Sequence, residues 1–270
     1  MERVGNGQEE FGLLYAHLED LCRRSAKGEA VSSSFLSPRE QHYATRFLAR
    51  MGETVYAFGG YDGAERQKLY LLPDYMRDAE GAQSDVVSLL RDFGFDCEIC
   101  ALRIIGSGYR MLTHRDFLGS LLALGVERSV IGDICVDEQG RSAVIFCEER
   151  MVPFLEQELL RVANDKVKLE RLAWNEFVLP ERQFEKITDT VASARLDCVV
   201  AALCSLSREK ARETVVGGLV EMNFESEDRP DREVVAPSIL SVRGFGRYRV
   251  TRLEDRTKKG RIRLEAERYR

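Results

Sequence analysis

The residues best suited to chemistry in this chain gather near the start of a short helix in its C-terminal third. The stretch 194–223 reads ARLDCVVAALCSLSREKARETVVGGLVEMN, in which two short helical patterns adjoin. Ser207 opens the second pattern, whose first turns carry three cations: Arg208, Lys210 and Arg212. Cations at a helix start oppose the helix dipole at a cost of roughly a few tenths of a kcal/mol each, unless an anion lies nearby. The spacing therefore predicts phosphate binding, with solvated charges on an ordinary helical hairpin as the alternative.

Two further segments near the C-terminus are suited to contact with nucleic acid. Gly244-Phe245-Gly246-Arg247 combines glycines, which permit close backbone approach, with an aromatic ring. Stacking of a base on such a ring contributes about 1–3 kcal/mol, and a structural turn with Phe245 partly buried is the equal alternative. A basic turn holds Lys258, Lys259 and Arg261, which suit phosphate contacts or a flexible basic tail. Arg195 has two interpretations of equal weight: a pair with Asp197 or another carboxylate, or contact with RNA.

Periodicity and capping residues predict the elements of the first part of the chain. A helix is expected over 8–26, followed by a linker over 27–34. Ser37-Pro38-Arg39-Glu40 has the residue types of a capping box, with proline in the first turn, and predicts a helix that ends near Met51 and Gly52. Two strands, 55–59 and 67–72, are expected to form a hairpin.

The middle of the chain alternates in a regular order. The pattern predicts a helix (83–93), then a strand (95–105), a helix (114–124), two strands (131–137 and 141–148) around the turn Glu138-Gln139-Gly140, a helix (151–163) and a strand (166–172). From the strand at 95 onward, this β-α-β-β-α-β order indicates a ferredoxin-like plait. RNA-recognition motifs share that topology, but their aromatic signature is absent from these strands. The topology therefore permits RNA binding without demonstrating it.

The remaining segments complete an α+β fold with a predicted three-domain organisation. A strand and connector are expected over 174–186, a strand over 219–225, a polar loop over 225–236, strands over 239–244 and 247–253, and a last strand around Ile262 and Leu264. The predicted domains are a small N-terminal α/β unit (1–78), the ferredoxin-like domain (79–175) and a C-terminal domain with basic terminal strands (182–270).

Composition excludes several classes of protein. The chain has 270 residues and a net charge of −5, and no run of 18 apolar residues spans a membrane. Residues 243–270 hold eleven Lys and Arg against four Asp and Glu, so residues 1–242 carry −12. A basic end on an acidic protein is compatible with RNA contact through part of the surface. The seven cysteines are scattered and odd in number, and the N-terminus lacks a secretion signal, which together predict reduced thiols and a cytoplasmic protein.

Two apparent catalytic or metal motifs do not support an enzyme. His114-Arg115-Asp116 has the residue types of a kinase catalytic loop, but Leu121 stands where that loop needs its asparagine. A helix N-terminus capped by Thr113 is the better interpretation, and it leaves Arg115 available to RNA. Cys97 and Cys100 have the spacing of a zinc knuckle, but in a strand this spacing points the thiols to opposite faces. We therefore expect no metal site, no cofactor and no catalytic residues.

Several segments resemble a known family. Arg195-Leu196-Asp197, Ser207-Arg208, Ala211-Arg212, Gly218-Leu219-Val220 and Asn223 together resemble the S-four domain, a small RNA-binding module of αL type named after a ribosomal protein. Residues 35–41, 59–66, 114–120, 124–128, 131–134, 241–247 and 257–261 extend the likeness, in order, to the bacterial YlmH family with its cyanobacterial and plastid photosystem-related S-four proteins. Arg-Leu-Asp also surrounds the catalytic aspartate of pseudouridine synthases, but only about 45 residues follow Asn223, too few for a catalytic domain.

The resemblance implies a non-enzymatic, monomeric RNA-binding protein of the translation machinery, with rRNA or tRNA on the large ribosomal subunit as partner and a possible role in the rescue of stalled ribosomes. Two alternatives stay open. One is an RNA-modifying enzyme, with Asp116 or Asp133 as the acid–base residue in a cleft between the plait and the N-terminal unit. The other is a protein scaffold in cell division or photosystem assembly. The residues predicted to contact RNA are Arg115, Arg195, Ser207, Arg208, Lys210, Arg212, Asn223, Arg243, Phe245, Arg247, Lys258, Lys259 and Arg261.

Overall fold

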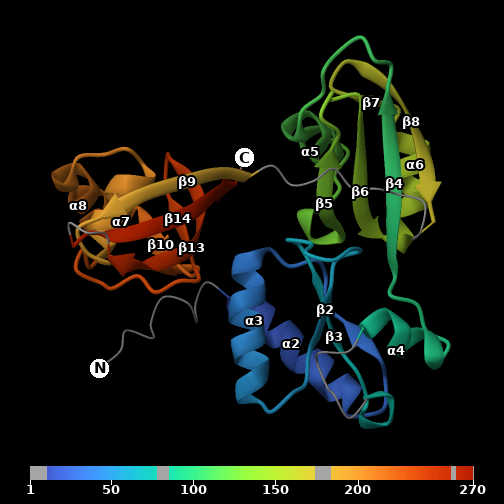
Figure 1. Cartoon of the computed structure of the whole chain (residues 1–270). Coiled ribbons are helices and arrows are strands. Elements are labelled where there is room, and N and C mark those ends of the chain that lie inside the picture. Colours follow the sequence, from blue (N-terminus) through green and yellow to red (C-terminus); the bar gives the residue numbers. More distant parts are fainter. Residues whose placement is uncertain (1–10, 78–84, 174–183, 257–259, 270) are drawn as a thin grey trace. The chain divides into compact units, whose positions relative to one another are not determined.

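The chain folds into two compact units, residues 1–180 and 181–270 (Figure 1). A computed structural model describes residues 11–77, 85–173, 184–256 and 260–269. Helices and antiparallel sheets occur in both units, which confirms a mixed α/β fold. The boundary predicted at residues 78 and 79 falls inside the first unit and remains a prediction. In the described ranges, no helix combines the length and apolar character that crossing a membrane would require.

The first unit begins with helices around a small three-stranded sheet. Its elements are α2 (Gly12–Ser25), β1 (Val31–Ser32), α3 (Pro38–Arg50), β2 (Tyr56–Phe58), β3 (Lys68–Leu71), a 3-10 turn (Asp74–Met76) and α4 (Val86–Asp92). The sheet order is β1-β3-β2, all antiparallel. The predicted capping box is present: the Ser37 hydroxyl accepts from the Glu40 N–H at 3.3 Å, and the Glu40 carboxylate accepts from the Ser37 N–H at 2.7 Å. The expected linker over 27–34 was wrong in part, because two of its residues pair with β3 as β1.

A five-stranded antiparallel sheet forms the rest of the first unit. Its elements are β4 (Ile99–Gly106), α5 (His114–Ala123), a 3-10 turn (Arg128–Val130), β5 (Ile131–Val136), β6 (Ser142–Glu148), a 3-10 turn (Glu149–Met151), α6 (Val152–Glu158), β7 (Arg161–Val162) and β8 (Asp165–Leu172). The sheet order is β5-β6-β4-β8-β7. Without β7, this is a split β-α-β arrangement, since β4 lies between β6 and β8.

The predicted helix over 151–163 was too long. It ends at Glu158, and Arg161–Val162 instead pair with the start of β8 as a hairpin. Ala163 takes a φ of +50° in the turn between the strands. Alanine seldom adopts this left-handed conformation, so only Asn164 and Asp165 after it gave a turn signal.

Apolar side chains cover both faces of the plait sheet over part of its length. Alternate residues of β4 and β6, such as Leu102 and Ile145, point toward a core shared with α5 and α6. The intervening residues, among them Ala101 and Phe146, pack with side chains of the N-terminal region, including Phe35. Cys97 and Cys100 fall in these two different cores, but the strand expected from residue 95 begins only at Ile99, so Cys97 precedes it.

Buried polar contacts join the N-terminal region to the plait. The Asp133 carboxylate accepts from the Tyr61 hydroxyl at 2.6 Å and from the backbone N–H groups of Glu65 and Arg66 at 2.8 and 3.0 Å. The buried Arg66 guanidinium donates to the carbonyls of Ile131, Phe35 and Arg128, each at 2.9 Å. Because these bonds link segments far apart in sequence, residues 11–77 and the plait form one folded body.

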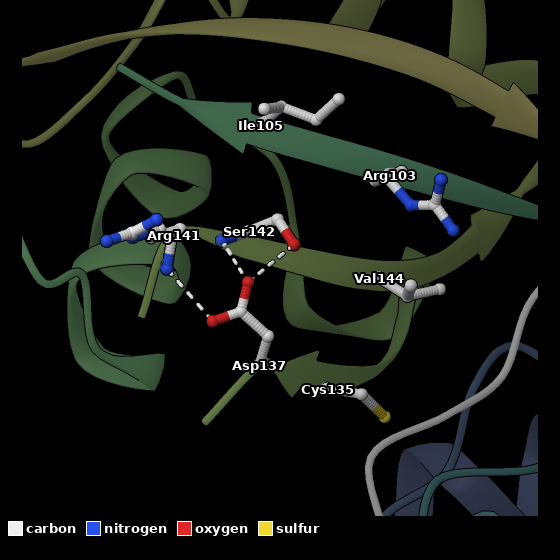
Figure 2. A pocket seen from close by; sticks show the side chains of 7 residues that line it. All are labelled: Arg103, Ile105, Cys135, Asp137, Arg141, Ser142 and Val144. Carbon is white, nitrogen blue, oxygen red and sulfur yellow. Dashed lines mark hydrogen bonds between the residues drawn. The ribbon is translucent and has the colours of Figure 1, made fainter. Parts of the chain in front are cut away.

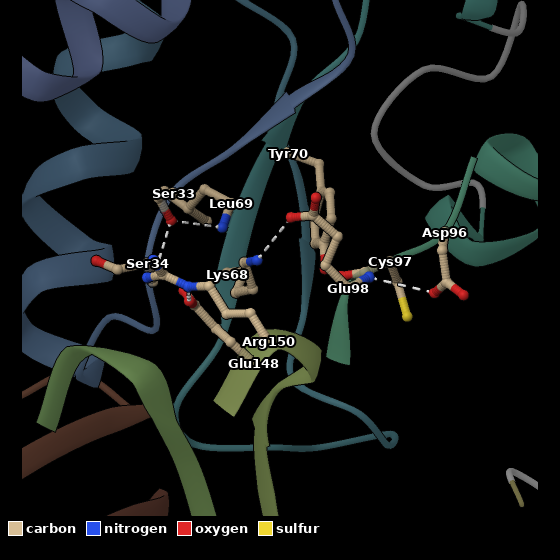
Figure 3. A network of polar contacts seen from close by, with 10 residues as sticks. All are labelled: Ser33, Ser34, Lys68, Leu69, Tyr70, Asp96, Cys97, Glu98, Glu148 and Arg150. Atoms are coloured by element: carbon tan, nitrogen blue, oxygen red, sulfur yellow. Dashed lines mark hydrogen bonds and ion pairs between the residues drawn. The ribbon is translucent and has the colours of Figure 1, made fainter. Parts of the chain in front are cut away.

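A second polar contact between these parts involves a buried lysine (Figure 3). The Lys68 side chain is 3 % exposed, and its Nζ lies 3.4 Å from the Glu98 carboxylate, which is largely exposed. Beside it, the buried Tyr70 hydroxyl donates to the Cys97 carbonyl at 2.7 Å. A buried ammonium needs such a partner, since desolvation of an unpaired charge costs several kcal/mol by rough estimate. The arrangement has a structural explanation and needs no ligand.

The second unit is a six-stranded antiparallel sheet with two helices on one face. Its elements are β9 (Phe184–Val191), α7 (Leu196–Leu203), α8 (Arg208–Val216), β10 (Val220–Met222), β11 (Glu225–Ser226), β12 (Ser238–Val242), β13 (Gly246–Arg256) and β14 (Ile262–Tyr269), in the sheet order β11-β10-β12-β13-β14-β9. Side chains of α7 and α8 pack with inward-facing residues of the sheet such as Leu240, Val250 and Leu264.

Three strand assignments in the second unit differ from the sequence-based prediction. β9 continues to Val191, beyond the strand and connector expected to end at residue 186. The strand expected over 219–225 ends at Met222, and Asn223 and Phe224 then take φ values of +51° and +69°. This turn leads into β11, which lies inside the expected polar loop. Pairing with a distant strand, rather than local propensity, fixes these short segments.

Candidate nucleic-acid interface

The start of α8 presents an exposed row of cations. Ser207 is the N-cap, and its hydroxyl accepts from the Lys210 N–H at 3.3 Å. The apolar side of α8 is buried through Ala211 and Val215, while Arg208, Lys210 and Arg212 are exposed. Ser207 therefore acts in this structure by shaping the helix start. The predicted juxtaposition of the three cations with the positive end of the helix dipole is present.

A buried carboxylate fixes two of the predicted arginines. The Asp197 side chain is only 3 % exposed and lies in the first turn of α7. Arg195 donates to both of its oxygens at 3.1 Å, and Nε of Arg208 donates to one of them at 3.4 Å. The Arg195 side chain nevertheless remains 41 % exposed and that of Arg208 61 % exposed. Arg195 thus makes the expected pair with Asp197 while it keeps an accessible guanidinium edge.

The electrostatics of this cluster favour the ionised carboxylate. Burial by itself would raise the pKa of Asp197, but hydrogen bonds from Arg195 and Cys198 and the charges of Arg195 and Arg208 outweigh it and hold the pKa below its ordinary value. Two guanidinium groups share one carboxylate, so the cluster carries a net positive charge. Held in place before any ligand arrives, such a pair loses little side-chain entropy on binding an anion.

The loop before β12 adds basic residues that sequence reasoning missed. The backbone of this loop binds the start of α7: the N–H groups of Leu196 and Asp197 donate to the carbonyls of Arg232 and Pro230 at 2.8 and 3.0 Å. Arg229 and Arg232 pair with Glu227 at 3.0 and 3.5 Å. The stretch reads as acidic and polar in sequence, so only the tertiary contact reveals that it lies beside Arg195.

Two predicted contact residues serve the backbone instead. The Asn223 side-chain oxygen accepts from the Ile239 N–H at 2.9 Å and holds the turn after β10. Phe245 is half-buried against the core of the unit, and its carbonyl accepts from Arg268 at 2.7 Å. The Gly244–Gly246 loop forms a turn in which Gly244 and Gly246 have φ values of +87° and +126°, and base stacking on Phe245 stays a prediction.

The other predicted residues lie at separate places. Arg243 is exposed, and its N–H donates to the carbonyl of Leu219, just after α8. The Arg247 guanidinium lies over the Tyr269 ring, 5.7 Å from its centroid, on the sheet face away from the helices. Arg261 bonds to the Thr190 hydroxyl at 2.9 Å and to the Thr190 carbonyl, and so ties β14 to β9.

Three predicted residues are not among the described residues of the C-terminal unit. Arg115 is exposed on α5 and belongs to the first unit. Lys258 and Lys259 lie outside the described residues. The structure therefore brings Arg195 and Arg208 together on Asp197, with Ser207, Lys210 and Arg212 at or near the start of α8 and Arg243 near the end of that helix.

Asp116 and Asp133, the candidate acid–base residues of an RNA-modifying enzyme, both have structural roles. Asp116 completes a capping box with Thr113, whose hydroxyl donates to it at 2.7 Å and, with the Thr113 N–H and the charges of Arg110 and Arg115, lowers the pKa of Asp116. Asp133 accepts the three hydrogen bonds that join Tyr61, Glu65 and Arg66 to β5. The lowered pKa of Asp116 lies further from neutral pH than a general acid or base requires.

No group of three His, Cys, Asp or Glu side chains is arranged to hold a metal ion within the described ranges. Burial raises the pKa of both Cys97 and Cys100 to about 11. Their thiolate forms, which are the metal ligands, are therefore rare at neutral pH.

These features define a class: an α/β protein with a rigid basic surface on a helical hairpin. Similarity to known proteins gives the family. A family model described as "Putative RNA-binding domain in YlmH" matches residues 94–176. The "Ribosome-associated protein quality control protein P2" of Bacillus subtilis (strain 168) is 30 % identical over 237 residues, which cover 87 % of this chain and 86 % of that protein. The chain belongs to the YlmH family.

A solved structure, the "Cell division protein ylmH from Streptococcus pneumoniae", is also similar. It aligns with a TM-score of 0.49 and 22 % identity, and the alignment covers 66 % of this chain and 98 % of that one.

Proposed function

We propose that this protein is a non-catalytic RNA-binding protein of the translation machinery, and that it contacts rRNA or tRNA on the large ribosomal subunit. The C-terminal unit serves as an S-four domain, and its contact surface is formed by Arg195, Arg208, Lys210 and Arg212. The observation that carries the proposal is the clamp of two exposed arginines on the buried Asp197, beside a basic helix start.

The family supports this assignment. The Bacillus subtilis relative is named as a ribosome-associated quality control protein, and the family model, which matches residues 94–176 of the first unit, describes an RNA-binding domain. We infer a role at stalled ribosomes, a monomeric state and a cytoplasmic location. The structural roles of Asp116 and Asp133 argue against the alternative of an RNA-modifying enzyme. Mass analysis of RNA from a deletion strain tests that alternative, which a lost modification would support.

Co-sedimentation with ribosomes and separated subunits, at low and moderate salt, tests the proposal. R208E/K210E reverses two charges on α8, and we expect it to abolish salt-sensitive comigration with the large subunit. K186E/R263E is the matched control, because it reverses two exposed charges in the same unit on the sheet face away from the helices. Retained comigration of folded R208E/K210E would exclude the α8 surface as the site. Comigration of the wild-type protein with neither subunit would exclude the ribosomal assignment.

A further inference from the structure

The plait sheet has an open pocket on the face opposite α5 and α6 (Figure 2). The N-terminal region covers this face at Ala101, Val144 and Phe146 and reaches Cys135, whose sulfur lies 3.8 Å from the Tyr61 hydroxyl, while Ile105 stays partly exposed. The pocket there has a volume of about 360 Å³. Ile105, Cys135 and Val144, from three neighbouring strands, supply its apolar floor, and its polar rim consists of Arg103, Asp137, Arg141 and Ser142.

The Asp137 carboxylate in this rim already accepts hydrogen bonds from its own turn. Asp137 accepts from the N–H groups of Gln139, Arg141 and Ser142 at 2.9, 3.0 and 2.6 Å, and from the Ser142 hydroxyl at 2.7 Å. Burial would raise the pKa of Asp137, but these hydrogen bonds outweigh it and lower the pKa. Asp137 is therefore an ionised anchor of the β5–β6 turn, and its lone pairs are used by the turn itself.

The side chains of the two pocket arginines, unlike that of Asp137, are not held by other residues in the described part of the chain. In the described part of the chain, neither the Arg103 nor the Arg141 guanidinium has a hydrogen-bond or ion-pair partner. The nearest acidic neighbour across the strands, Glu170, faces Arg103 in register but accepts from Lys168 at 2.9 Å. Figure 2 shows the two arginine side chains at opposite ends of the pocket, with the apolar floor between them. The pocket therefore offers two guanidinium groups that make no ion pair in the described part of the chain, beside a floor that Ile105 and Cys135 leave partly exposed.

We propose that this pocket binds a short segment of single-stranded RNA, with a base against the floor and the flanking phosphates on Arg103 and Arg141. Its volume lies within the roughly 300–1,000 Å³ of small-ligand sites. Guanidinium forks match phosphate geometry, and a base can reach an apolar floor only when it is unpaired. The proposal rests on the RNA-binding function proposed above and adds a second contact surface, in the other unit.

A loop beside the pocket offers a stacking surface. Tyr109, between β4 and α5, is 98 % exposed. The same loop packs on the β5–β6 turn, because a Cβ added at Gly140 would lie 2.5 Å from Cγ of Met111. An exposed aromatic ring close to basic side chains is typical of single-strand binding sites. The RNA path would therefore continue from Arg141 toward this loop.

Fluorescence anisotropy of the full chain with a labelled oligouridine, across a range of salt concentrations, tests the proposal. R103Q/R141Q removes both pocket charges, and R91Q/R161Q is the matched control with two exposed arginines of the same unit outside the pocket. Two lost phosphate contacts should reduce the slope of log affinity against log salt by about 1.4, since each contributes roughly 0.7 for a single strand. Saturating oligouridine should also slow alkylation of Cys135 in the wild-type protein and not in R103Q/R141Q.

Each result decides between the two surfaces. The pocket proposal is overturned if the slope of log affinity against log salt is unchanged in R103Q/R141Q. It is also overturned if oligouridine does not change the rate of Cys135 alkylation in the wild-type protein, or if the wild-type protein does not bind oligouridine. If R208Q/K210Q binds normally while R103Q/R141Q does not, the α8 surface fails and the pocket stands. If R103Q/R141Q keeps its affinity for oligouridine but no longer co-sediments with the large subunit, the pocket binds an acidic protein segment and not RNA. Thermal unfolding verifies that each variant is folded.

Discussion

In the C-terminal unit Arg195 and Arg208 converge on the buried carboxylate of Asp197, whereas in the first unit Arg103 and Arg141 flank a pocket whose only rim carboxylate, Asp137, is held by its own turn. The first pair is fixed before a ligand arrives, and the second keeps its rotamer freedom. Fixed arginines bind with a smaller loss of entropy, while free ones adapt to a ligand at a greater entropic cost. We therefore expect the α8 surface to supply most of the affinity and the pocket to supply a weaker, adaptable contact.

The largest expected effect is the salt dependence of RNA binding. With about four to eight phosphate contacts, wild-type affinity should fall by roughly 10²–10⁴ between about 50 and 200 mM salt. R208Q/K210Q should flatten that slope more than R103Q/R141Q does, because Arg208 belongs to the fixed pair. Filter binding or anisotropy measures both slopes. If R103Q/R141Q flattens the salt dependence more than the α8 variant does, the pocket and not the α8 surface supplies most of the phosphate contacts.

Removal of the carboxylate that fixes the first pair should have the next largest effect. D197N loses a buried charge-assisted pair, and we expect a loss of about 1.5–3 kcal/mol in the free energy of unfolding, together with weaker RNA binding from the freed arginines. Urea unfolding and anisotropy measure the two quantities. D228N, an exposed aspartate of the same unit, is the control. Unchanged RNA affinity in D197N would show that fixing the arginines contributes nothing to binding.

Acid should lower the stability that the ionised carboxylates of Asp197 and Asp137 contribute to the fold. The pKa values of Asp197 and Asp137 lie below the ordinary 3.8. A depressed folded-state pKa contributes stability that is present above the unfolded value and is lost as pH falls through the folded one. Urea midpoints should therefore decrease below about pH 4 in the wild-type protein, and less steeply in D197N and D137N. A midpoint in D197N that follows the wild-type pH profile would contradict the ionised anchor.

The smallest expected effect concerns Phe245. Because the ring packs against the core of its unit, F245L should cost less than about 1.5 kcal/mol of stability and leave RNA affinity unchanged. Loss of a stacked base would instead weaken binding by about 1–3 kcal/mol. Anisotropy with oligouridine and with isolated large subunits separates these outcomes.

Local signals in the sequence were sufficient for much of the fold. The caps at Ser37, Thr113 and Ser207 were predictable because a capping side chain acts within three residues of its target. The hairpin turn at Glu138–Gly140 was predictable for the same reason. Two-residue strands such as β1 and β7 were not, since pairing with a distant strand creates them.

The site was less predictable than the fold. The sequence located the α8 cations, but only the structure shows that Arg195 pairs with the buried Asp197 and keeps an accessible edge. The pocket arginines went unnoticed, although an arginine within the apolar run of β4 alternates with inward-facing Leu102 and Ile104 and so had to face the other way. Arg141 gave no such signal, because a cation in a turn is ordinarily solvated.

The shared core of the first unit has a consequence for synthesis of the chain. Phe35 and Phe146 pack in one cluster, and Asp133 supplies the acceptors for the segment around Arg66. A nascent chain that has emerged only as far as β3 can therefore bury the face that its early helices share with the hairpin, but it cannot bury the opposite face, which carries Tyr56 and Tyr70. That face stays exposed until β6 leaves the exit tunnel, so the first unit completes its folding late in translation.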